Sequence, residues 1–109
     1  MNSDEYLVVM TTVDSVAGAE GLATTLVERR LAACVQITGP VSSTYRWEGE
    51  ITRSQEWLCL IKTRRASYEA LEAAIRELHS YQTPEIVAVP IVAGSAEYLK
   101  WIDEETRNP

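Results

Sequence analysis

The sequence predicts an α+β fold in which strands and helices follow the order strand, helix, strand, strand, helix, strand, helix. Three observations lead to it. Apolar and β-branched runs of strand length alternate with segments whose apolar residues recur at three- and four-residue spacing. A turn at 48–50 joins the two middle strands into a hairpin. The 109 residues fit one compact domain, residues 1–109.

The first strand and helix are expected within residues 6–30. Residues 6–12 form a continuous apolar and β-branched run, which is typical of a buried strand. Asp14 and Ser15 offer N-cap oxygens for a helix that should end near Arg30, because cationic side chains complement the negative C-terminal dipole. The apolar stripe of this helix consists of Ala19, Leu22, Ala23, Leu26 and Val27.

A long hairpin is expected in the middle of the chain, with strands that begin at Ala33 and return over 56–63. Gly39-Pro40 indicates a bulge inside the first arm rather than its end. Gly49 supplies the positive φ that the turn requires. Each arm is about fifteen residues long, which exceeds the usual strand length. The hairpin should therefore reach beyond its own domain and pair with a neighbouring chain.

The second half repeats the helix and strand. Ser67 can cap a helix that must stop before Pro84. Its apolar stripe is Tyr68, Leu71, Ile75 and Leu78. The last strand is expected over 85–92, at a sheet edge, because Pro90 cannot donate a ladder hydrogen bond. A short final helix should begin at Gly94-Ser95.

Two strand–helix–strand crossovers around a hairpin define the ferredoxin-like βαββαβ arrangement, here with a long hairpin and a C-terminal helix. Right-handed crossovers place both long helices on one face of the sheet. The strands at 6–10 and 57–61 nevertheless show no alternation of polar and apolar residues, as expected for a sheet that is buried on both faces. The sequence thus predicts a symmetric oligomer in which another copy covers the open face.

Charge and hydropathy exclude some classes of partner and predict the cellular compartment. The net charge of −6 disfavours nucleic acid and anionic membranes as partners. No apolar run reaches the roughly 20 residues of a membrane span, and the acidic start lacks the features of a signal peptide. The expected location is the cytoplasm, where Cys34 and Cys59 should be reduced and buried.

No catalytic residue is predicted, and the chain is not expected to be an enzyme. It has one histidine, His79, and no nucleophile elbow, so a hydrolase is disfavoured. Glycine-rich phosphate loops are absent as well. An acid/base role for His79 with Glu85 is the remaining enzymatic alternative, and Glu48 has the simpler interpretation of a turn charge.

Several motifs, taken together and in order, resemble the CutA family of divalent-cation tolerance proteins. They are LAACV at 31–35, YRWEG at 45–49, IKT at 61–63, HSYQTPEI at 79–86, and Gly94-Ser95 followed by Tyr98-Leu99 and Trp101. The resemblance implies a ferredoxin-like homotrimer similar in architecture to the PII signalling proteins. It also implies an association with tolerance of copper, as Cu(II), or of another divalent metal.

Cys34 and His79 are the candidate metal ligands that match family motifs, because copper and zinc favour thiolate and imidazole. A strong site needs three or four ligands. The alternative is a buried cysteine and a histidine that serves only hydrogen bonds. Two departures weaken an inherited site: Met10-Thr11-Thr12 lacks the cysteine of some members, and Gln82 replaces a common glutamate.

A small-molecule site is the alternative to a metal site. Lys62, Trp47, Tyr81 and Glu85, with His79, match the family and suggest a cleft between subunits. Aromatic walls with a few directed polar groups are typical of ligand pockets. In this interpretation the protein is a PII-like sensor that binds an anionic ligand, and Lys62 is the cation that attracts it.

Overall fold

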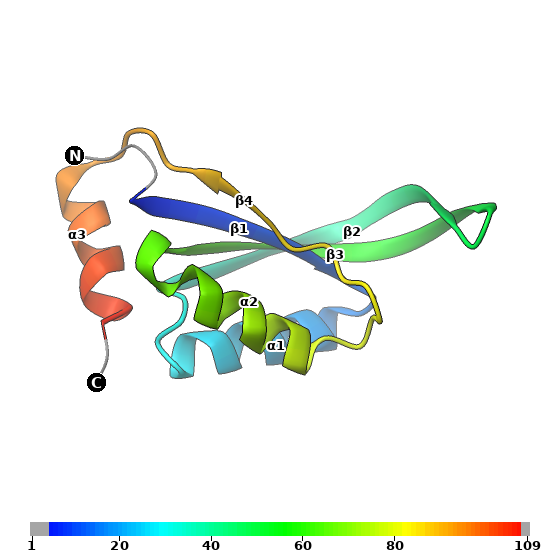
Figure 1. Ribbon diagram of the computed structural model, residues 1–109, viewed down its shortest axis with the longest axis horizontal. Helices are drawn as coiled ribbons and strands as arrows, with labels where there is room; N and C mark the ends of the chain where they lie inside the picture. The colour runs from blue at the N-terminus through cyan, green and yellow to red at the C-terminus, as the bar shows by residue number, and fades with distance from the viewer. Residues whose placement is uncertain (1–4, 108–109) are drawn as a thin grey trace.

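The computed structural model describes residues 5–107 and contains one four-stranded sheet and three α-helices (Figure 1). In chain order the elements are β1 (Tyr6–Val13), α1 (Val16–Glu28), β2 (Cys34–Trp47), β3 (Glu50–Arg64), α2 (Tyr68–Leu78), β4 (Val87–Pro90) and α3 (Ala96–Glu105). A short 3₁₀ turn, Arg65–Ser67, precedes α2. This order confirms the predicted α+β, βαββαβ arrangement with a terminal helix.

The sheet is antiparallel throughout, with strand order β2-β3-β1-β4. Strand β1 lies in the centre, where Tyr6 pairs with Arg64 at one end and Val13 with Trp57 at the other. Strand β4 lies at the edge, as its proline predicts, and Pro90 pairs with Leu7. It has four residues rather than the eight expected over 85–92, because β1 begins at Tyr6, whose carbonyl accepts the Ile91 N–H at 2.8 Å and ends the pairing there.

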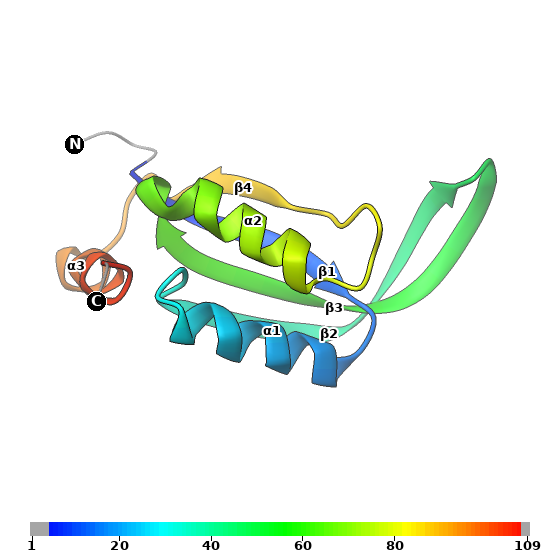
Figure 2. The same ribbon diagram turned by 60° about the horizontal axis from the view of Figure 1, so that its bottom comes forward.

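Helices α1 and α2 lie side by side on one face of the sheet (Figure 2). The core forms between them and the sheet, and its largest fully buried apolar side chains are Val9, Leu26, Ile61, Leu71 and Ile75. The Ser15 hydroxyl caps α1 by accepting from the Gly18 N–H at 2.9 Å, as predicted. Ser67, by contrast, makes no side-chain cap, because it lies in the 3₁₀ turn with αR backbone angles.

The predicted apolar stripes of α1 and α2 are buried at the middle of each helix, but one predicted stripe residue of each helix is exposed. Val27 of α1 and Leu78 of α2 are exposed, although both have stripe spacing. Each stands at the last turn of its helix, where the chain leaves the sheet. Burial at a helix end depends on what the following turn covers, which the periodicity does not contain.

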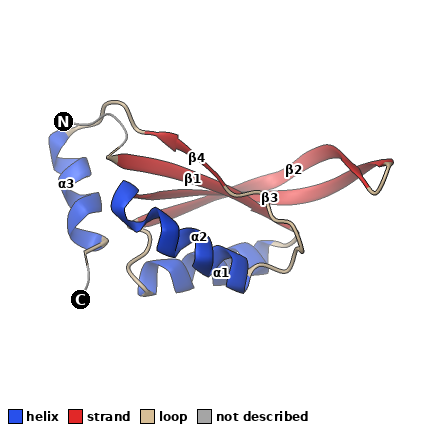
Figure 3. Cartoon of the chain, in the orientation of Figure 1, coloured by secondary structure: helices blue, strands red, loops and turns tan. Residues whose placement is uncertain are grey.

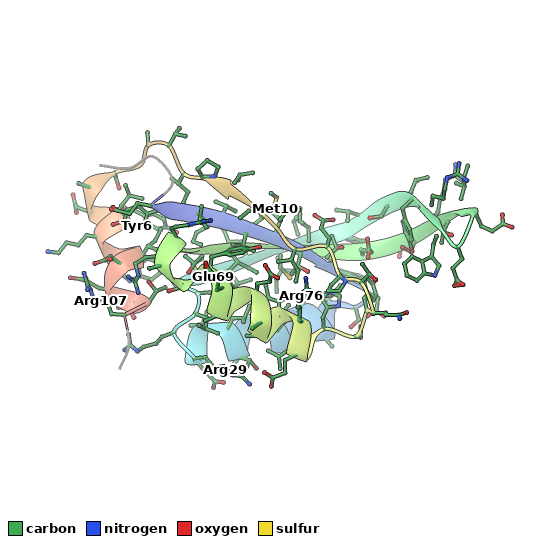
Figure 4. The ribbon with its side chains drawn as sticks, in the orientation of Figure 1. Tyr6, Met10, Arg29, Glu69, Arg76 and Arg107 are labelled. Atoms are coloured by element: carbon green, nitrogen blue, oxygen red, sulfur yellow. The ribbon has the colours of Figure 1, made fainter. Side chains whose placement is uncertain are left out.

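The opposite face of the sheet carries no helix in the described residues (Figure 3). Its side chains alternate with the core residues and are mostly apolar: Val8, Met10, Leu58, Leu60, Val87 and Val89. Figure 4 shows Met10 on the side away from α1 and α2. Val87 and Val89 are 46% and 45% exposed. We call these six residues the open face. The prediction that the sheet is apolar on both sides is confirmed.

The hairpin of β2 and β3 reaches well beyond the helices (Figure 1). Its arms are 14 and 15 residues long, as expected. The register shifts between Thr38 and Val41, which is the irregularity that Gly39-Pro40 predicted. Gly49 has φ +82 at the tip. The outer half of the hairpin is largely exposed.

Helix α3 packs against one end of the sheet and is held there by Arg64, the last residue of β3. The Arg64 guanidinium donates to the Thr106 hydroxyl at 2.8 Å and to the Thr106 carbonyl at 2.9 Å. The Ser95 hydroxyl caps the helix by accepting from the Tyr98 N–H. None of the helices in residues 5–107 is long and apolar enough to cross a membrane.

Candidate functional site

His79 links the connection between α2 and β4 to the end of β1 through a side-chain hydrogen bond. Its Nε2 donates to the Thr12 carbonyl at 2.8 Å, and its Nδ1 accepts from the Tyr81 N–H at 3.0 Å. A carbonyl only accepts and a backbone N–H only donates, so a neutral imidazole with its proton on Nε2 satisfies both bonds. Within one chain, both ring nitrogens of His79 are thus engaged.

Tyr81 extends from the same connection to the hairpin. Its hydroxyl donates to Oε2 of Glu56 at 2.7 Å, and its ring lies 4.8 Å from the His79 ring, centroid to centroid. Burial raises the pKa of Tyr81, and the hydrogen bond and negative charge of Glu56, with the charge of Asp14, raise it further. Tyr81 is therefore a neutral hydrogen-bond donor across the physiological range.

A groove of about 800 Å³ lies where the hairpin leaves the sheet, beside the connection between α2 and β4. Figures 1 and 2 show the two segments next to each other there. The groove is lined by three aromatic residues, two carboxylates, five residues with small hydroxyl side chains, an amide and a proline, namely Tyr45, Trp47, Tyr81, Glu56, Glu85, Thr12, Ser43, Thr44, Ser54, Thr83, Gln82 and Pro84. This combination of aromatic walls and a few polar groups suits a small ligand.

The structure brings three of the four predicted small-molecule residues to this groove: Trp47, Tyr81 and Glu85. Lys62 lies elsewhere within the chain. It pairs with Cys34 across β2 and β3, and its Nζ donates to Oε1 of Gln36 at 2.6 Å. An anionic ligand in the groove would therefore need a cation from another chain.

Cys34 and His79, the predicted metal ligands, are not neighbours within one chain. Cys34 lies opposite Lys62, whereas the carbonyl that binds His79 belongs to Thr12, opposite Leu58. Four residues of β3 separate these two positions, which corresponds to roughly 13 Å along the strand. Across residues 5–107, no three His, Cys, Asp or Glu side chains are grouped so as to hold a metal ion.

Cys34 is half-buried rather than buried, while Cys59 is fully buried, and both thiols are free. Burial raises the pKa of Cys59. Cys34 lies beside the hydroxyl of Tyr98, whose pKa is raised by burial first and then by Cys34. Of the two thiols, Cys34 is thus the one that a metal ion can approach.

Glu56 is the site residue that sequence reasoning missed. It is 5% exposed, lines the groove and accepts the Tyr81 hydrogen bond. Its hydrogen bond with Tyr81 joins residues that are 25 positions apart, so no local sequence pattern predicts this contact. The available signal is a carboxylate directly before the apolar run Trp57–Ile61, because carboxylates are rarely buried unless they have a partner.

A four-stranded antiparallel sheet with two helices on one face, an overlong hairpin and a terminal helix defines the class of small α+β proteins with a ferredoxin-like fold. The sequence comparison places the chain within this class. It belongs to the CutA1 divalent ion tolerance protein family, whose model matches residues 7–105.

Individual relatives agree with the family assignment. The divalent-cation tolerance protein CutA of Thermus thermophilus is 48% identical over 99 residues, which cover 91% of this chain and 96% of that protein. The chloroplastic protein CutA of Arabidopsis thaliana is 40% identical over 102 residues, and the chain spans 56% of its length. The solved structure of Cut A1 from Thermus thermophilus superposes with a TM-score of 0.91 at 46% identity, covering 94% of this chain and 99% of that one. The family is named for ion tolerance rather than for a reaction.

Proposed function

We propose that this chain acts as a cytoplasmic homotrimer in the tolerance of divalent metal ions, copper among them. Membership of the CutA1 family over residues 7–105 is the observation that carries the proposal. The function is one of binding and response, and no residue of the chain is assigned a catalytic role.

The trimer is supported by the open face and the hairpin. An uncovered apolar surface on a sheet favours burial against another copy of the chain. The outer halves of β2 and β3 offer free strand edges on which a neighbouring sheet can pair. The number three comes from the family resemblance.

The metal proposal assigns Cys34 as the thiolate ligand and His79 as an imidazole ligand contributed by a different subunit. Separate subunits are required because the two side chains lie far apart within one chain. His79 would also have to exchange its hydrogen bond to Thr12, or to Tyr81, for the metal. A Cys–His pair suits Cu²⁺ or Zn²⁺.

Titration of the native protein with Cu²⁺, and with Zn²⁺ as a redox-inert parallel, tests this assignment. Cys34→Ser should weaken binding strongly, because a hydroxyl is a poor ligand for either ion. His79→Ala should weaken binding too. Cys59→Ala is the matched control, because it removes the buried thiol and leaves Cys34 in place. Equal affinity in Cys34→Ser and the native protein would contradict the assignment.

A second candidate function, binding of a small molecule as a sensor, is favoured by the groove with its aromatic walls. In the anionic version of this candidate, Lys62 of a second subunit supplies the positive charge. A thermal-shift screen of small anions on the native protein and on Lys62→Ala tests that version. The stabilisation should vanish in Lys62→Ala, and anions that stabilise both proteins equally would contradict the role of Lys62.

A further inference from the structure

The groove is negatively charged. Among the described residues that line it, Glu56 and Glu85 are acidic, and no lysine, arginine or histidine is present. Asp14 lies close enough for its charge to raise the pKa of Tyr81. The whole chain carries −6 at pH 7. Within one chain, the potential in the groove therefore favours a cation as the ligand.

Glu56 is the group that a cation would contact. It is 5% exposed, and its side chain receives one hydrogen bond from the described residues, that of Tyr81 to Oε2. No positively charged side chain pairs with it among residues 5–107. A buried carboxylate without a counter-charge is costly, so a bound cation at Oε1 would relieve that cost.

The walls of the groove distinguish between a metal ion and an organic cation. A metal ion needs several ligand atoms converging on one point, and the described residues provide no such group. Tyr45, Trp47 and Tyr81 instead present aromatic rings, which attract ammonium groups through the faces of the rings and pack against carbon chains. Hydroxyl oxygens of Ser43 and Ser54, which pair across the hairpin on the same face as Glu56, add acceptors for N–H donors.

We propose that the groove binds a small primary aliphatic ammonium ion, with its nitrogen on Glu56 and its carbon chain against Trp47 and Tyr45. A primary ammonium has three N–H donors, which match the carboxylate and the hydroxyls at this end of the groove. Glu85, also in the lining, provides a second carboxylate for a diammonium ion. The inference rests on the small-molecule candidate function and reverses the charge of its ligand.

Three four-carbon probes test the charge directly: n-butylammonium, n-butanol and n-butyrate, each titrated into the native protein at matched ionic strength. The chemical shift of the Trp47 indole N–H reports binding, because Trp47 lines the groove and is 45% exposed. Butylammonium should bind with a Kd at least about tenfold below that of butanol, since a charge-assisted hydrogen bond adds roughly that factor. Butyrate should bind most weakly.

Glu56→Gln tests the contact residue. The amide keeps the side-chain length and an oxygen to accept the Tyr81 hydrogen bond, but it removes the charge. Butylammonium affinity should fall by about tenfold, while butanol affinity stays unchanged. Glu50→Gln is the matched control: it removes one carboxylate from the exposed start of the same strand, outside the groove lining, and should leave both affinities as they are.

Each other outcome overturns the inference in a recognisable way. Tighter binding of butyrate would reverse the charge and leave the small-molecule candidate standing. Equal binding of butylammonium and butanol would reduce the groove to an apolar site. No binding of any probe would remove both the inference and the small-molecule candidate.

Trp47→Ala keeps the inference testable if Glu56→Gln fails to fold. Trp47 is half-exposed on the hairpin, so its removal should leave the core intact. Calorimetry then replaces the indole signal. Butylammonium affinity should fall severalfold because the carbon chain loses the indole surface against which it packs, and an unchanged affinity would overturn the proposed pose.

Discussion

The two faces of the sheet are made from the same strands but are completed in different ways. On one face Val9 and Ile61 are fully buried beneath α1 and α2. On the other, Val87 and Val89 remain nearly half exposed, although they are equally apolar. Within residues 5–107, helices cover one face of the sheet only. The difference teaches that the closed face specifies the fold of one chain, whereas the proposed trimer assigns the open face and the hairpin to contact with further copies.

Ile61→Ala tests the closed face and should have the largest effect. Ile61 is fully buried in the core, so its truncation should lower the free energy of unfolding by about 2–5 kcal/mol. The loss arises within one chain. Urea unfolding should therefore give a loss that does not depend on protein concentration.

Leu60→Ala is the matched change on the open face, one residue earlier in β3 and pointing to the opposite side. Its cost should grow with protein concentration, because Leu60 becomes fully buried only when another copy covers it. Concentration-independent losses of the same size for Leu60→Ala and Ile61→Ala would contradict the distinction between the two faces.

Gly39→Ala tests how the hairpin joins the sheet and should have an intermediate effect. A Cβ at Gly39 would lie 2.5 Å from Cδ1 of Trp57, so the indole would have to move, at a cost of about 1–3 kcal/mol. Thermal unfolding measures it. Gly21→Ala is the control, since its Cβ meets no atom within 4 Å and a helical alanine should stabilise by up to about 1 kcal/mol. If Gly21→Ala were destabilised as much as Gly39→Ala, the contact with Trp57 would not be the cause of the loss in Gly39→Ala.

The dependence of the free energy of unfolding on pH above 10 tests the contact between Tyr81 and Glu56. It should show the smallest effect of the series. Burial and Glu56 raise the pKa of Tyr81 in the folded protein, whereas in the unfolded chain it titrates at its ordinary pKa of about 10. A raised folded-state pKa stabilises below pH 10, and this stabilisation is lost as the pH rises above it. The free energy of unfolding should thus decrease above pH 10.

Tyr81→Phe should flatten this decrease, although Tyr6, Tyr68 and Tyr98 also have raised pKa values and contribute to it. Unfolding measured in urea from neutral pH to pH 11 provides the comparison. An unchanged slope in Tyr81→Phe would show that Tyr81 ionises alike in both states, contrary to its buried hydrogen bond with Glu56.

The fold was largely predictable because it depends on local periodicity. The apolar run of β1, the stripe of α2 and the turn at Gly49 each stand in the sequence and appear in the structure. The length of β4 was not predictable, since it depends on how far β1 offers partners beyond Pro90. Serine is a favoured N-cap residue, yet Ser67 makes no cap hydrogen bond, because it lies in the 3₁₀ turn with αR backbone angles.

The candidate site was predictable in part. The resemblance led to Trp47, Tyr81 and Glu85, and the structure gathers these three at one groove. The two ring nitrogens of His79 are used by Thr12 and Tyr81, and this depends on a tertiary contact that no motif expresses. Glu56 was missed for the same reason, because its partner is 25 residues away.

The mass of the native protein in solution tests the central claim most directly. If two further copies cover the open face, sedimentation equilibrium at micromolar concentration should give three times the 12.2 kDa of the chain, and dilution should not release stable folded chains. A folded species of 12.2 kDa that persists at that concentration would contradict the claim, since the open face would then be stable in water by itself.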